Sequence, residues 1–190
     1  SPLRAGALFW RGYLAFFAGD YERTRADETE ALELARDLSD TATEARALNA
    51  LGLLESQSDP GASLSMLERA CELARTASHQ WCLAEATQNV GWSLIQVGRY
   101  DDARAALDAS FEIARPNGWR ELESWHWLMV GHAIYPTGEL EEARTVWERG
   151  LRGAGDAQEG FAKWALGLLD VDAGAPAEAY ERLSRARGRM

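Results

Sequence analysis

The side chains in this sequence that could carry out chemistry are two cysteines and three histidines. A zinc site needs several such ligands at short, regular spacings. Cys71 and Cys82 show no metal-ligand spacing with His79, His126 or His132. Two cysteines also make no disulfide framework. We therefore expect no metal site and no redox role.

Acidic side chains are abundant, but their positions do not predict catalysis. The chain carries 30 Asp and Glu against 20 Lys and Arg, and the acids fall at expected helix starts or on exposed helical positions, where they favour the helix dipole and solubility. No glycine-rich phosphate loop follows a strand pattern, and no Ser-His-Asp arrangement rises above chance. We predict that this protein is not an enzyme and uses no cofactor.

Glycine recurs at a regular interval along the chain. Successive steps between the interior glycines are 40, 39, 40 and 36 residues, for Gly12, Gly52, Gly91, Gly131 and Gly167. After four of these, a second glycine follows seven residues later, and after the other one Asp-Pro-Gly supplies the turn. Such self-similarity is typical of repeat architectures.

Each period predicts a helical hairpin, because an apolar-periodic segment, a turn and a second amphipathic segment follow one another. The interior glycine lets two helix backbones approach closely, and a glycine such as Gly98 ends a helix in the left-handed conformation. The expected helices span residues 4–18, 21–38, 42–57, 61–77, 80–97, 101–115, 119–135, 139–152, 157–173 and 176–187. The expected units of a single repeat domain, a fragment of a larger protein, are about 1–40, 41–78, 79–117, 118–155 and 156–190.

This pattern resembles the tetratricopeptide repeat (TPR), which places small and apolar residues at fixed positions. The third unit matches it with Gly91, Gly98, Tyr100, Ala103, Leu107 and Phe111, and the fourth with Gly131, Gly138, Leu140, Ala143, Trp147 and Leu151. The resemblance implies an all-α fold, a right-handed superhelix of about five TPR-like helical hairpins. In the first unit, Thr24 and Glu28 stand where alanine and an apolar residue are expected. We therefore expect its second helix to cover the first one poorly.

The resemblance also implies where a partner would bind. In this family the first helices line a concave groove, and the residues three before and one after the interior small residue point into it. On this sequence these positions combine aromatic and amide groups, which suit a protein, a peptide or a small polar inducer. For two of the tryptophans, Trp125 and Trp164, packing between adjacent hairpins is an equal alternative. The Lys and Asn pattern of chaperone-binding carboxylate clamps is missing, so binding of a C-terminal carboxylate by such a clamp is disfavoured. The expected partner-binding residues are Phe9, Tyr13, Arg46, Asn49, Leu53, Glu85, Gln88, Trp92, Gln96, Trp125, Leu128, His132 and Trp164.

Charge and hydropathy argue against further functions. A net charge of -10 disfavours nucleic-acid binding, since phosphate neutralisation needs a concentrated basic surface. No segment approaches about 18 uninterrupted apolar residues, and the first residues lack the organisation of a signal peptide. We expect no membrane insertion and a cytoplasmic location.

Cys71 shares a repeat position with Phe111 and is expected in the core. The basic cluster, read as a solvated helix face, is Arg182, Arg185, Arg187 and Arg189.

Several phrases of the sequence, such as "ALNALGLLESQSDP" and "GRYDDARAALDASFEIAR", resemble the repeat arrays of large bacterial ATP-dependent LuxR-type and MalT-like regulators. This resemblance implies the sensor or interaction region of a bacterial transcriptional regulator, whose nucleotide-binding and DNA-binding parts lie elsewhere in the polypeptide. The alternative is a free-standing adaptor or assembly scaffold that binds a protein client.

The first expected helix carries apolar side chains around most of its circumference. A terminal repeat normally shows a polar outer face, because it has no neighbour on that side. We expect the extra apolar face to be covered by upstream repeats of a longer protein or by self-association through helix one. Its apolar side chains include Leu8, Phe9, Trp10, Tyr13, Leu14, Phe16 and Phe17.

Overall fold

A computed structural model describes residues 1–152 and 154–187, which form α-helices and two short 3-10 segments and contain no strand. The expected all-α array of TPR-like hairpins is confirmed, and the helix bounds differ from the expected ones by at most two residues. Each of these helices is too short or too polar to span a bilayer. The helices are α1 (Pro2–Phe17), α2 (Tyr21–Leu38), α3 (Thr41–Glu55), α4 (Pro60–Thr76), α5 (Gln80–Gln96), α6 (Tyr100–Ala114), α7 (Arg120–Ile134), α8 (Leu140–Leu151), α9 (Asp156–Asp172) and α10 (Pro176–Arg187).

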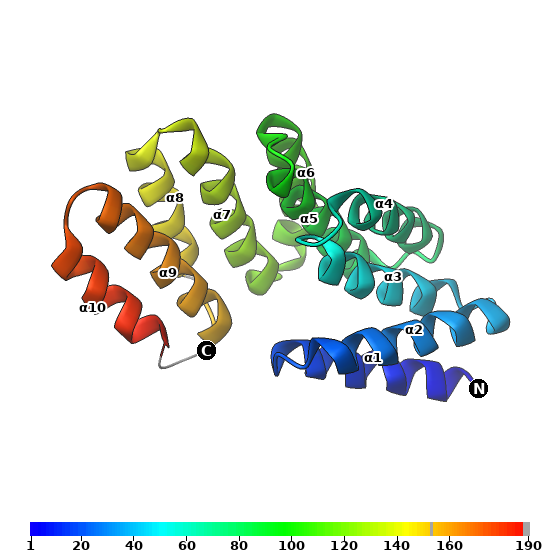
Figure 1. Ribbon diagram of the computed structural model, residues 1–190. Helices are drawn as coiled ribbons and strands as arrows, with labels where there is room; N and C mark the ends of the chain where they lie inside the picture. Colours follow the sequence, from blue (N-terminus) through cyan, green and yellow to red (C-terminus); the bar gives the residue numbers. More distant parts are fainter. Residues whose placement is uncertain (153, 188–190) are drawn as a thin grey trace. The chain divides into compact units, whose positions relative to one another are not determined.

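The chain divides into two compact units, Ser1–Ser110 and Phe111–Met190. The first unit holds α1 to α5 and most of α6, and the second holds α7 to α10. Within each unit, consecutive helices lie side by side and run in opposite directions, as α1 and α2 or α9 and α10 show in Figure 1. The helices therefore pair into hairpins, and the expected single domain remains a prediction.

Local signals in the sequence fix where the helices begin and end. Asp20, Asp40 and Asp59 each cap a helix, because a side-chain oxygen accepts the backbone N–H three residues later at 3.0 to 3.1 Å. These caps satisfy donors that have no partner inside the helix. At the end of α5, Gly98 has a φ of 75°, as expected for a residue that ends a helix in the left-handed conformation.

The interior glycines lie where the two helices of a hairpin cross. A Cβ built on Gly91 would come within 2.7 Å of Leu107, and one on Gly52 within 2.8 Å of Leu67. Real Cβ atoms do not approach other atoms so closely, and these leucines are fully buried. Each hairpin thus packs a large side chain of its second helix directly against a bare backbone in its first. We call this large side chain the knob of the hairpin.

The expectation that α2 covers α1 poorly is wrong. Thr24 and Glu28 are completely buried beneath α1. The hydroxyl of Thr24 lies 3.1 Å from the carbonyl oxygen of Gly12, so its polar atom is satisfied inside the hairpin. Glu28 takes the knob position, with one carboxyl oxygen 2.5 Å from the Cβ that Gly12 lacks. The methylene groups of Glu28 fill the space that a leucine fills elsewhere, which is why the first hairpin still closes.

Two ion clusters hold neighbouring helices together. In the first unit, Arg11 donates to both carboxylate oxygens of Asp27 at 2.6 Å, and this guanidinium lowers the pKa of that carboxyl. In the second unit, the buried carboxylate of Asp170 accepts from Arg144 on α8 and from Arg182 on α10. Arg182 therefore belongs to the packing of the last hairpin. Arg189 and the side chains of the other two members of the basic cluster, Arg185 and Arg187, lie outside the described part of the chain.

One face of α1 stays exposed within its unit. Phe9 is buried, whereas Trp10, Leu14 and Phe17 are 56%, 68% and 51% exposed. Neighbouring rings on this helix contact one another; for example, the Tyr13 and Phe17 centroids are 5.0 Å apart. The expected surplus of apolar side chains on the first helix is thus a real surface feature of the first unit.

The carboxyl group of Glu28 makes the first hairpin sensitive to pH. Both of its oxygens are buried without a hydrogen-bond partner among the described residues. Burial, with the charge of Asp27 as a smaller cause, raises its pKa to about 9 from 4.5. Because the folded state retains a proton that the unfolded chain releases, this group destabilises the fold increasingly as pH rises from 4.5 toward 9. At pH 7 the cost is about 3 kcal/mol.

We predict that Glu28→Leu, which restores the usual knob, raises the free energy of unfolding by about 3 to 4 kcal/mol at pH 7.5 and by much less at pH 5. Urea unfolding followed by circular dichroism at the two pH values measures this difference. Glu33→Leu is the control, since Glu33 is an exposed acid on the same helix and should change stability by less than about 0.5 kcal/mol. An equal effect of Glu28→Leu at both pH values would contradict the prediction.

Candidate functional site

Four of the expected partner-binding residues meet in one cavity of the first unit. Phe9 and Tyr13 come from α1, Arg46 from α3 and Glu85 from α5. The cavity has a volume of about 270 Å³. Three more residues line the cavity and were not expected from the sequence. Two of them could have been noticed, because Trp10 directly follows Phe9 in α1 and Trp81 stands at the start of α5. The three residues are Trp10, His79 and Trp81.

Arg46 lies against the aromatic wall of this cavity. Its guanidinium carbon is 4.3 Å from the ring centroid of Phe9 and 6.0 Å from that of Trp10. The two rings contact each other edge to face, with centroids 5.2 Å apart. A cation over a ring face is attracted by the negative π surface, by about 0.5 to 2 kcal/mol. This half-buried arginine is therefore held by rings from another helix.

A row of amide groups connects α3 and α5 next to the cavity. Asn49 donates to Glu85 at 3.0 Å and accepts from Asn89 at 2.9 Å. Asn49 and Gln88, both expected to face a partner, are only 5% and 2% exposed. A partner role for these two amides remains a prediction, and in this conformation Asn49 positions the carboxylate of Glu85. The sequence analysis did not predict a role for Asn89. Its position next to Gln88, as a second amide side chain, was the one feature of the sequence that could have indicated it.

A second cavity of the first unit contains two further expected residues. Leu53 of α3 and Trp92 of α5 line a space of about 280 Å³. Phe16 and Tyr21 close it from the first hairpin, and Arg25, which pairs with Glu55, lies at its edge. Gln96 is exposed at the end of α5 and lines neither of these two cavities.

In the second unit, three expected residues join one aromatic cluster. The imidazole of His132 stacks on both Phe161 and Trp164, with centroid separations of 4.7 and 5.6 Å, and these two rings contact each other at 5.8 Å. Trp125 contacts Phe161 edge to face, with centroids 5.4 Å apart. Trp164 is 40% exposed, so the cluster reaches the surface of this unit. Phe161, three residues before Trp164 on α9, was missed by sequence reasoning.

Burial determines the charge state of His132. Its Nδ1 lies 3.1 Å from the carbonyl oxygen of Leu128 and 3.1 Å from the indole nitrogen of Trp147. That indole N–H also donates to the Leu128 carbonyl at 2.8 Å. Leu128, expected to face a partner, is itself fully buried beneath this arrangement. Burial lowers the pKa of His132 to about 4, so the ring is neutral at physiological pH.

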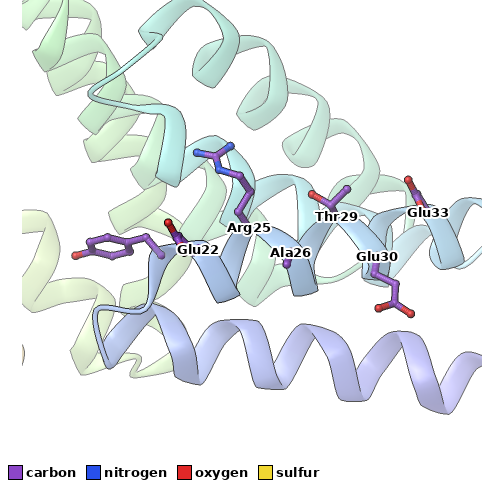
Figure 2. Close-up of a pocket in the computed structure, with 7 residues that line it drawn as sticks. Glu22, Arg25, Ala26, Thr29, Glu30 and Glu33 are labelled. Carbon is purple, nitrogen blue, oxygen red and sulfur yellow. The ribbon is translucent and has the colours of Figure 1, made fainter.

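Another hollow, of about 750 Å³, runs along the outer face of α2 (Figure 2). All of its lining side chains come from this single helix. Figure 2 shows Glu30 pointing toward α1 and Arg25 pointing the opposite way, toward α3. Arg4 pairs with Glu30, and Arg25 pairs with Glu55. The hollow is a shallow groove on one helix whose charges serve hairpin packing, so it offers no converging groups for a ligand.

The cysteines belong to the core, as expected for Cys71. Cys71 and Cys82 are buried and free, and burial raises the pKa of both thiols, to about 12 for Cys82. Reactive thiolates are therefore scarce at neutral pH. In the part of the chain that the structure describes, no three His, Cys, Asp or Glu side chains gather in a way that could hold a metal ion.

Comparisons with known proteins show the fold. No protein-family model matches the chain, and no curated protein matches it. Among solved structures, it is similar to a Rap protein complexed with competence and sporulation factor, with a TM-score of 0.84 and 16% identity over 98% of this chain and 55% of the other. The Rap conjugation gene regulator of the plasmid pLS20, complexed with the Phr* peptide, gives a TM-score of 0.79 and 17% identity over 94% and 51% of the two chains.

A third similar structure is that of MamA from Desulfovibrio magneticus RS-1, with a TM-score of 0.56 and 16% identity over 97% of this chain and 94% of the other. All three are TPR-like helical-repeat proteins. The chain spans about half the length of the Rap proteins it matches. The likeness to Rap and MamA establishes a TPR-like fold, whereas the expected likeness to LuxR-type and MalT-like regulators remains a prediction.

The neutral state of His132 predicts a loss of stability in mild acid. The unfolded chain binds a proton near pH 6.5, while the folded chain does so only near pH 4, so stability falls as pH decreases between these values. The loss attributable to this residue is about 2 kcal/mol at pH 5. We expect the NMR signal of the His132 Hε1 proton to titrate with a midpoint near 4, and His132→Leu to reduce the difference in unfolding free energy between pH 7 and pH 5. A midpoint above 6 would contradict this prediction.

Proposed function

We propose that this chain is a peptide-binding module and the sensor region of a bacterial transcriptional regulator, acting in the cytoplasm without direct contact with DNA. The observation that carries the proposal is the pair of cavities on the first helices of the first unit. Aromatic walls and a few fixed polar groups are the usual composition of sites that bind peptides and small ligands. A small polar inducer would use the same surface.

The spacing of the two cavities suits an extended chain. Arg46 lines one and Leu53 the other, and seven residues of α3 separate them, which is about 10 Å along the helix axis. An extended peptide covers this distance with about three residues. Glu85, which accepts from Asn49, lines the first cavity, and a carboxylate of this kind is a hydrogen-bond acceptor for peptide N–H groups.

The structural neighbours support this proposal. One Rap protein is complexed with competence and sporulation factor and another with the Phr* peptide, and the second is described as a conjugation gene regulator. The alternative function, an adaptor or assembly scaffold, is favoured by the likeness to MamA, which this chain matches over nearly its whole length.

A displayed library of random peptides, selected against the immobilised full chain, tests the peptide-binding proposal. For a synthetic peptide obtained in this way, we expect Tyr13→Ala and Trp92→Ala each to weaken binding by about 1 to 3 kcal/mol, because aromatic residues in cavities dominate binding energy. Fluorescence polarisation measures the affinities. Tyr180→Ala, at an exposed position of α10, is the control and should leave binding unchanged. Failure to select any peptide, or equal affinities for all variants, would contradict the proposal.

We also propose that the exposed face of α1 mediates self-association. Side chains such as Leu14 and Phe17 form an apolar surface of a kind that soluble monomers rarely leave uncovered. Light scattering of the chain should show a dimer or larger species that Leu14→Glu with Phe17→Glu converts to a monomer, while both cavities stay intact. Val171→Glu, at an exposed apolar position of α9, should not change the molecular mass. A wild-type monomer at high micromolar concentration would refute this proposal.

A further inference from the structure

Arg46 differs from most arginines of the first unit in what surrounds it. Arg11, Arg25 and Arg36 each pair with a carboxylate of the chain. Arg46 makes no ion pair among the described residues, although it is half-buried. The aromatic ring of Phe9 lies over its guanidinium instead.

The hydrogen-bonding capacity of Arg46 is largely unused. A guanidinium has five N–H donors. Within the described residues its only hydrogen bond runs from Nη2 to the hydroxyl of Thr43, at 3.4 Å, and its buried Nε has no acceptor. Removing such donors from water without replacing their acceptors is costly. The group that best matches the planar fork of a guanidinium is a carboxylate, which accepts two parallel hydrogen bonds.

The cavity that Arg46 lines limits the size and shape of a ligand that could carry this carboxylate. Its volume of about 270 Å³ lies slightly below the range of about 300 to 1,000 Å³ that small-molecule sites occupy. It therefore has room for one amino-acid residue and not for a large cofactor. The rings of Trp10, Tyr13 and Trp81 offer flat apolar surface to a side chain.

The cavity also contains a negative charge, opposite in sign to that of Arg46. Glu85 lines it and is oriented by the amide of Asn49. A carboxylate there repels a second anion but accepts a hydrogen bond from an amide N–H. A ligand that carries a carboxylate and an amide N–H next to an apolar side chain matches the charges of Arg46 and Glu85.

We propose that Arg46 binds the carboxylate of a peptide residue whose apolar side chain enters the aromatic cavity of the first unit. This proposal rests on the peptide-binding function proposed above and names the chemistry of one anchor. The carboxylate comes either from an acidic side chain or from a peptide C-terminus. The Lys and Asn pattern of a carboxylate clamp is not involved, because a single arginine held by ring faces supplies the donors.

The test compares N-acetyl-L-phenylalanine with N-acetyl-L-phenylalanine amide, which have the same shape and differ in charge. We expect the acid to bind the full chain with a Kd on the order of 1 mM, to shift the indole N–H signals of Trp10 and Trp81 in NMR spectra, and to bind at least tenfold more tightly than the amide. Equal binding of the two compounds, or shifts confined to other tryptophans, would overturn the proposal.

Variants assign the effect to the guanidinium. Arg46→Gln should reduce the affinity for the acid to that for the amide, and Arg46→Lys should keep part of the preference because it keeps the charge without the fork. Arg75→Gln removes an exposed arginine of α4 and should change neither affinity. Dispersed NMR spectra show whether each variant is folded. Since the acid and amide are compared first on the wild-type chain, a variant that does not fold still leaves a decisive result.

Peptides with blocked ends identify the source of the carboxylate. Tighter binding of Ac-Ala-Phe-Glu-Ala-NH2 than of its Gln counterpart supports an acidic side chain, and tighter binding of Ac-Ala-Gln-Phe with a free C-terminus than of its amide supports a terminus. No preference in either pair overturns the proposal. Selected peptides that bind without any dependence on Arg46 would reject this anchor and leave the peptide-binding function standing. If the acid binds at Arg46 but no peptide can be selected, the peptide-binding function would be rejected while the carboxylate site at Arg46 would stand.

Discussion

The structure depends on close contact between the two helices of each hairpin. An interior glycine in the first helix meets the knob of the second, and the approach is so tight that a Cβ on Gly131 would lie 2.3 Å from the Trp147 ring. In three hairpins the knob is a fully buried apolar side chain, namely Leu67, Leu107 or Trp147. Burial of such a side chain contributes about 2 to 5 kcal/mol as judged by truncation. With the helix pairs fixed at this distance, neighbouring hairpins of a unit can stack and their first helices can form a common surface.

Variation at the knob gives individual hairpins their own chemistry. Leucine at position 67 or 107 only fills space, whereas Glu28 brings a buried carboxyl group into the first hairpin. Trp147 fills the same place in the fourth hairpin, and its indole N–H bonds to the carbonyl of Leu128 and contacts His132. Among the described residues other than cysteine, the two groups with the largest pKa shifts, Glu28 and His132, thus arise at or beside one repeat position, in different units.

The surface made by the first helices of the first unit combines rigidity with unused binding capacity. Hydrogen bonds between Asn49, Asn89 and Glu85 fix the middle of this surface. On one side of that row, Arg46 lies against Phe9 with few hydrogen bonds, and on the other side Leu53 and Trp92 line an apolar hollow. A ligand would therefore meet groups already in place, which reduces the entropic cost of binding.

The sequence by itself determined the hairpins, their bounds and the glycines at their crossings, because helix periodicity, caps and turn residues act over short distances along the chain. It also identified the helices that carry the candidate site. It could not determine which way each side chain on those helices turns. Gln88 and Leu128 were expected to face a partner and are buried. Trp10 and Trp81, which the repeat positions did not indicate, line the cavity of the first unit. The ring under Arg46 comes from a helix more than thirty residues away, and the pKa of Glu28 follows from how completely α1 covers it. Contacts between segments distant in sequence decide burial and pairing, and these appear only when the hairpins pack.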